Sequence, residues 1–121
     1  MKIAVLMGLT AIALLISIAS AMAACALSDV QITGWKWRLE NGYVIGLGEI
    51  MTGCVTPIGV QIQVTIRDAT GSLLDVKEEW PASIRNIPPG DPYPFKTRLR
   101  EVKGTAAVEV RAIDLRRWDE R

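Results

Sequence analysis

The clearest pattern in the chain is a strict alternation of apolar and polar residues that begins at Val60 and lasts until the turn at Asp68. Apolar side chains take the even positions and polar ones the odd positions, and this period of two predicts a strand with one buried face. Turn-forming residues follow up to Gly71, after which the alternation resumes. We expect a second strand there, with Leu74 and Val76 facing the same core as the even residues of the first.

Upstream, two sets of apolar residues belong to one predicted strand but are out of step with each other. The first set is Val30 and Ile32, and the second is Trp35, Trp37 and Leu39. A β-bulge near Thr33-Gly34 adds one residue to the strand and would bring both sets to the same face.

The pair Asn41-Gly42 follows this strand and favours a two-residue hairpin turn, because both residues readily take positive backbone angles. The next predicted strand runs through Tyr43, Ile45 and Leu47 toward Ile50. Its glycines, Gly46 and Gly48, permit bends or close backbone packing.

Two more alternating segments lie near the C-terminus, from Phe95 to Arg100 and from Val108 to Ala112. About six or seven short strands with frequent turns predict an all-β fold, an antiparallel immunoglobulin-like β-sandwich. The proline-rich segment 84–95 (IRNIPPGDPYPF) is followed by only about two strands, too few for a second core. We therefore interpret it as a stiff crossing inside one domain rather than a linker.

Residues 1–24 have the three parts of a signal peptide, namely Lys2, an apolar stretch and a run of small residues before Cys25. We expect a signal helix at residues 1–24 and a single domain at residues 25–121 that ends in a short charged tail. The alternative is an uncleaved membrane anchor, because the uncharged stretch is long enough to span a bilayer. Either way the domain is expected to be exported, to the periplasm or the extracellular space.

The order of several features resembles the bacterial FxLYD domain family over about residues 45–99. These features are Gly48-Glu49-Ile50, Pro57-Ile58, the strand ending at Asp68, Gly71, Leu73-Leu74, and Ile87-Pro88-Pro89-Gly90-Asp91 followed by Phe95. The signature Phe-x-Leu-Tyr-Asp corresponds here to Val64-Thr65-Ile66-Arg67-Asp68, in which Arg67 replaces the tyrosine and only the aspartate is retained. A neighbouring immunoglobulin-like family with the same strand order is the alternative. Either resemblance implies an exported sandwich domain without known catalytic residues.

Cys25 and Cys54 are the only cysteines in the chain. An even count in an exported chain favours a disulfide, and the predicted hairpin brings the start of its first strand beside the end of its second. The competing interpretation is lipidation of Cys25, because Met22-Ala23-Ala24-Cys25 resembles a bacterial lipobox. A metal site is disfavoured, since two cysteines without a histidine fall short of a four-ligand set.

Composition disfavours several functional classes. The chain has no histidine, which excludes triads that rely on imidazole, and we expect neither catalytic nor cofactor-binding residues. Its formal net charge is +1, which gives no support for nucleic acid as a partner. Contact with a membrane is expected only through a lipid on Cys25 or through an uncleaved leader.

Tryptophans are the candidates for a ligand or partner surface. Trp35 and Trp37 share one strand face, where they either form a platform for a sugar or a protein or fill the core. Trp118 lies among charged residues and is expected to be the more exposed. We interpret the chain as a noncatalytic module with a protein partner or a structural role, and carbohydrate or small-ligand binding is the alternative.

Overall fold

The computed structural model describes residues 25–119, and its regular structure is almost entirely β. A short 3-10 helix, η1 (Leu27–Asp29), precedes the first strand. The strands of this part of the chain are β1 (Val30–Glu40), β2 (Tyr43–Thr52), β3 (Gly59–Arg67), β4 (Leu73–Glu79), β5 (Tyr93–Arg100) and β6 (Ala107–Arg116).

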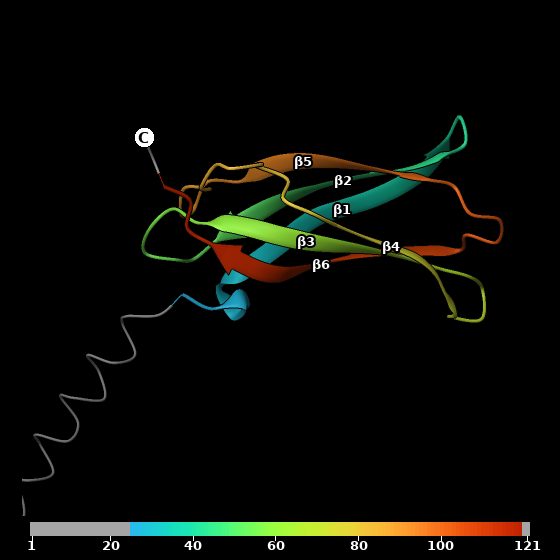
Figure 1. Ribbon diagram of the computed structural model, residues 1–121, viewed down its shortest axis with the longest axis horizontal. Coiled ribbons are helices and arrows are strands. Elements are labelled where there is room, and N and C mark those ends of the chain that lie inside the picture. The colour runs from blue at the N-terminus through green and yellow to red at the C-terminus, as the bar shows by residue number, and fades with distance from the viewer. Residues whose placement is uncertain (1–24, 120–121) are drawn as a thin grey trace, which may run out of the picture.

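The six strands form two antiparallel three-stranded sheets that lie face to face (Figure 1). The first sheet has the order β1-β2-β5 and the second has the order β4-β3-β6. The chain crosses from one sheet to the other after β2, after β4 and after β5. The predicted all-β antiparallel sandwich is therefore confirmed.

The core lies between the sheets, and its buried residues come from β2, β3, β5, β6 and the connection between β4 and β5. The even residues of β3 are its centre, since Val60, Ile62, Val64 and Ile66 are each at most 1% exposed. The other members of the buried cluster are Val44, Ile50, Ala82, Ile87, Phe95, Leu99 and Val108. The alternation in the sequence thus predicted the buried face of β3 correctly.

The predicted β-bulge in β1 is also confirmed. Pairing with β2 passes from Thr33 opposite Glu49 to Lys36 opposite Leu47, so β1 contains one extra residue. Gly34 lies at this point with φ of +64°, a backbone angle that glycine adopts without strain. As a result, Val30 and Ile32 before the bulge and Trp35 and Trp37 after it pack against the core. Leu39, near the end of the strand, is 46% exposed.

The turn between β1 and β2 has the predicted form. Asn41 and Gly42 have φ angles of +50° and +82°, as a type I′ hairpin turn requires. This turn fixes the register of the hairpin, in which Glu40 pairs with Tyr43.

The expectation that Val76 faces the core is wrong. Val76 pairs with Thr65 on the outer face of the second sheet and is 45% exposed. The register between β3 and β4 shifts between Ile66 and Arg67. Beyond Leu74, the residues of β4 therefore face the opposite way from the predicted alternation. The residues of β4 that pair with the inward residues of β3 are instead Asp75, Lys77 and Glu79.

The proline-rich segment connects β4 of the second sheet to β5 of the first. Ile87 is buried and forms an isolated antiparallel bridge with Ile58. The backbone N–H of Gly90, which has φ of +77°, donates to the carbonyl of Thr52 at 3.0 Å. The segment is therefore tied to the sandwich, in agreement with its interpretation as a crossing inside one domain.

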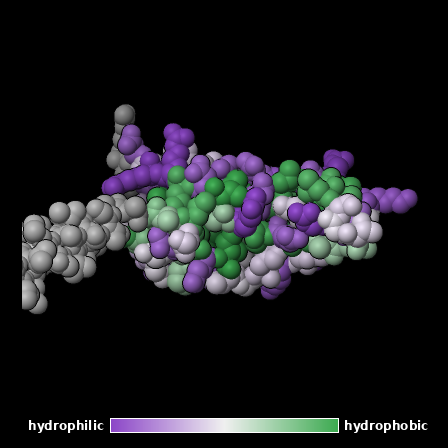
Figure 2. Space-filling model, turned by 90° about the horizontal axis from the view of Figure 1, so that it is seen from below, coloured by the Kyte–Doolittle hydropathy of each residue, from purple (hydrophilic) through white to green (hydrophobic). Residues whose placement is uncertain are grey.

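One flank of the sandwich is less completely covered than the rest of the core. Most of the partly buried apolar residues packed on the core belong to β1 and β6, and we call them the β1–β6 flank: Val30, Ile32, Trp35, Trp37, Val110, Ala112 and Leu115. Figure 2 views the molecule from the side on which β6 lies in Figure 1, and hydrophobic surface gathers along its middle.

Within residues 25–119, no helix is long and apolar enough to cross a membrane. The expected signal helix, or anchor, at residues 1–24 lies outside the described residues, as does the end of the charged tail at residues 120–121.

Candidate functional site

Trp35 faces the core and does not form an exposed platform. Its ring stacks on Phe95 with centroids 6.1 Å apart, and its Nε1 donates to the carbonyl of Val108 at 3.0 Å. Gly46 and Gly48 leave room for it, because a Cβ on Gly48 would come within 2.9 Å of the Phe95 ring and 3.4 Å of the Trp35 ring. Trp35 is thus a structural link between the two sheets.

Trp37 and Trp118 are also packed rather than presented to solvent. Trp37 is half-buried against the core. Trp118 is half-buried and meets Trp80 edge to face, with ring centroids 5.6 Å apart. The side-chain amide of Asn86 bonds both the N–H and the carbonyl of Trp118 at 2.9 Å, and the guanidinium of Arg116 lies over its ring. These contacts hold the segment against the domain, so Trp118 is half-buried like the other tryptophans.

Cys25 and Cys54 form a disulfide. The bond ties the chain before η1 to the segment after β2, at the end of the hairpin where the sequence placed both cysteines. A lipid thioether on Cys25 is incompatible with this bond, since both use the same sulfur. Asp29 is close to both sulfurs, but disulfide sulfurs are not thiolate ligands for a metal.

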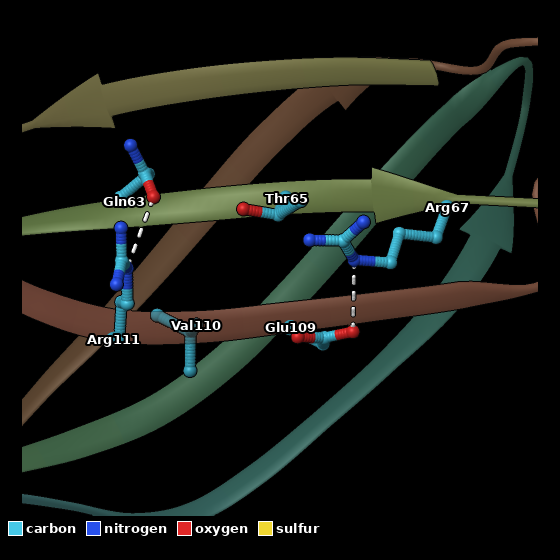
Figure 3. Close-up of a pocket in the computed structure, with 6 residues that line it drawn as sticks. All are labelled: Gln63, Thr65, Arg67, Glu109, Val110 and Arg111. Carbon is cyan, nitrogen blue, oxygen red and sulfur yellow. Dashed lines mark hydrogen bonds and ion pairs between the residues drawn. The ribbon is translucent and has the colours of Figure 1, made fainter. Parts of the chain in front are cut away.

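The outer face of the second sheet carries a shallow hollow of about 210 Å³. In Figure 3 its polar residues pair with one another across β3 and β6. Arg67 forms an ion pair with Glu109 at 3.3 Å, and Arg111 donates to Gln63 at 3.1 Å. These groups satisfy each other, and no pair of them has the arrangement of a nucleophile with an adjacent general base.

The outer face of the first sheet has a different character, because cations flank the apolar residues of β2. Leu47 pairs with Lys36 on one side and Lys96 on the other. In the next row, Ile45 pairs with Arg38 and with Arg98. We call this surface the basic face, and its cationic residues are Lys36, Arg38, Lys96, Arg98 and Arg100.

Aromatic and apolar groups lie among these cations. The guanidinium of Arg98 sits 3.7 Å from the centroid of the Tyr43 ring, within cation–π distance. Ile45 is only 6% exposed although it points outward, which indicates that the stems of its arginine neighbours cover it. The face thus offers planar guanidinium groups held on apolar surface.

The acidic residues on the basic face are Glu40 and Glu49. Arg38 donates to Glu40 at 2.8 Å, and this bond, with the charges of Arg38 and Lys96, holds the pKa of that carboxyl below its ordinary value. Five cations against two carboxylates leave the face positive, although the chain as a whole is almost neutral.

Sequence reasoning missed this face. The alternation of Lys36 with Arg38, and of Lys96 with Arg98, was visible as the polar phase of two separate strands. Their convergence depends on β2 lying between β1 and β5, which the sequence pattern does not specify.

No protein-family model, curated protein or solved structure matches the chain. The resemblance to the FxLYD domain family therefore stays a prediction.

Proposed function

We propose that the chain is an exported, noncatalytic β-sandwich module that binds another protein, and that its basic face contacts an acidic surface of that partner. The observation that carries the proposal is the pair of rows in which cations flank an apolar residue of β2. Arginine and tyrosine are enriched at the energetic centres of protein interfaces, and Arg98 stacked on Tyr43 supplies both.

The distribution of charge supports a protein partner over a nonspecific polyanion. Nucleic acid and anionic membranes select chains with an excess of basic residues, whereas this chain has a formal net charge of +1. A local basic face on a nearly neutral domain suits a partner with a local acidic patch of matching size.

Export is supported by the apolar leader and by the disulfide, which is typical of oxidising compartments. Expression with its own leader, followed by intact-mass measurement and thiol alkylation, tests this part of the proposal. We expect a mass that begins near Cys25 and no alkylation until reductant is added. A retained leader with two reactive thiols would contradict export.

Binding through the basic face is tested by capture from an extract of the producing cell's envelope. The domain is immobilised as wild type and as Arg38→Glu/Arg98→Glu, and bound proteins are identified by mass spectrometry. The matched control is Arg85→Glu/Arg117→Glu, which makes the same change in charge at exposed residues outside the basic face.

We expect wild type and control to retain the same acidic protein, and the basic-face variant to lose it. Retention should weaken as salt is raised, because exposed charges are screened over about 10 Å at 0.1 M. Equal retention by all three proteins would contradict the proposal.

A further inference from the structure

The edges of the two sheets are not equally protected. Among the described strands, β1, β4, β5 and β6 are edges. Natural edges carry bulges, prolines or inward-pointing charges, because unpaired backbone groups otherwise recruit another strand. β4 turns the charged residues Asp75, Lys77 and Glu79 toward the core side, and β1 is interrupted by its bulge.

β5 is protected in two other ways. Pro94 occupies the start of the strand, and Nζ of Lys77 donates to the carbonyl of Arg98 at 3.0 Å from across the sandwich. β6 is protected at one point, because Nε1 of Trp35 donates to the carbonyl of Val108, but its residues 109–112 contain no proline and no inward-pointing charge. Its register shift comes only after Ala112.

The backbone of β6 is oriented to accept another strand. The carbonyl of Val108 accepts a bond from Trp35 of β1, so it points away from β3. Main-chain groups alternate in direction along an antiparallel strand, and those of Val110 and Ala112 therefore also point outward. Beside them lies the apolar β1–β6 flank (Figure 2), which a neighbouring strand with its own apolar face would cover.

The charges on β6 are complementary to those on a second copy of β6 that runs antiparallel to it. Glu109 and Arg111 stand on either side of Val110, on the outer face of the sheet. In a two-fold antiparallel pair centred on Val110, Glu109 of each copy lies opposite Arg111 of the other. Val110 of one copy then pairs with Val110 of the other, and their outward main-chain groups form the hydrogen bonds of that pair.

We infer that β6 pairs with β6 of a second copy of this chain, so that two three-stranded sheets join into one continuous sheet. The two β1–β6 flanks meet across the same two-fold axis and cover each other. This inference does not depend on the proposed function, because the basic face lies on the other sheet and stays accessible in the dimer.

Charge reversal tests the pairing. Protein expressed with its own leader and purified is measured by sedimentation equilibrium as wild type, Glu109→Arg and Arg111→Glu. Each single variant places like charges opposite each other at two positions, and we expect its dimer dissociation constant to rise about tenfold or more. The matched control is Lys96→Glu on the other sheet, which should dimerise like wild type.

Complementation separates this arrangement from other interfaces. An equal mixture of Glu109→Arg and Arg111→Glu should dimerise again, because every pair in the mixed dimer has opposite charges. The doubly reversed variant Glu109→Arg/Arg111→Glu should do so alone. A monomeric wild type, a dimer that both single variants leave unchanged, or a mixture that stays monomeric would overturn the inference.

A cysteine at the two-fold axis gives a readout that does not depend on charge. Hydrogen-bonded antiparallel pairs have Cα atoms about 5.5 Å apart, within the range of a disulfide. Mild oxidation should therefore link two copies of Val110→Cys and leave Thr65→Cys, on the neighbouring strand, unlinked. Equal linkage of the two variants, or none in Val110→Cys, would also overturn the inference.

Discussion

Replacing Gly46 with alanine tests how the two sheets are held together at Trp35. A Cβ on Gly46 would contact the end of the Trp35 ring and lie 2.8 Å from Cγ2 of Thr97. The indole must then shift and stretch its bond to the carbonyl of Val108. Overpacking of this kind costs about 1–3 kcal/mol, and a lost hydrogen bond about 0.5–1.5 kcal/mol. We expect Gly46→Ala to lower the free energy of unfolding by about 2–4 kcal/mol.

Urea denaturation followed by tryptophan fluorescence measures this loss, and Gly53→Ala is the matched control. The nearest atom to a Cβ on Gly53 is the carbonyl oxygen of Asp29 at 3.6 Å, an ordinary contact. Its free energy of unfolding should stay within about 0.5 kcal/mol of wild type.

A double-mutant cycle with Trp35→Phe isolates the contact itself. The smaller ring makes room for the methyl group, so the cost of Gly46→Ala should fall by about 1–3 kcal/mol in the Trp35→Phe background. Additivity of the two substitutions within about 0.5 kcal/mol would refute the placement of Trp35 over Gly46.

Three further predictions concern the core, the disulfide and the β3–β4 turn. Ile62→Ala should cost about 2–5 kcal/mol and Gln63→Ala, on the outer face of β3, almost nothing, and equal costs in urea titrations would show that the assigned face of β3 is wrong. Reduction of the Cys25–Cys54 bond, which joins residues 29 apart, should lower the free energy of unfolding by about 3–4 kcal/mol, and an unchanged urea midpoint would contradict this. In the turn, the Thr70 hydroxyl and then the Ser72 N–H hold the pKa of Asp68 below its ordinary value. A carboxyl with a lowered pKa in the folded state stabilises the fold at pH values above its unfolded-state pKa, and this stabilisation should be lost as the pH falls through the folded-state pKa. A carboxyl titration by NMR that gives Asp68 an ordinary pKa would contradict this prediction.

Local patterns in the sequence predicted the elements whose structure depends on nearby residues. The buried face of β3 follows from alternation alone, and the turn at Asn41-Gly42 follows from residues that tolerate positive φ. The bulge at Gly34 was visible as a break in phase between two apolar sets. The hairpin favoured the disulfide over lipidation of Cys25, because it brings the chain before β1 beside the end of β2.

Features that depend on contacts between distant strands could not be predicted in this way. Alternation alone predicts that Val76 faces the core, because the register shift between Ile66 and Arg67 leaves no signal in the sequence of β4. The charged neighbours of Trp118 favour its exposure, whereas Asn86, far away in the sequence, holds it half-buried against the domain. The basic face likewise depends on strand order, since β1 and β5 meet only through β2.

The central claim is that the basic face contacts a protein partner. A photoreactive amino acid in place of Leu47, in the middle of that face, tests it in the producing cell, with the same substitution at Thr65 on the outer face of the second sheet as the control. The account predicts a covalent adduct of defined mass with an acidic protein from position 47 and none with that protein from position 65. No adduct from position 47, or the same adduct from both positions, would contradict it.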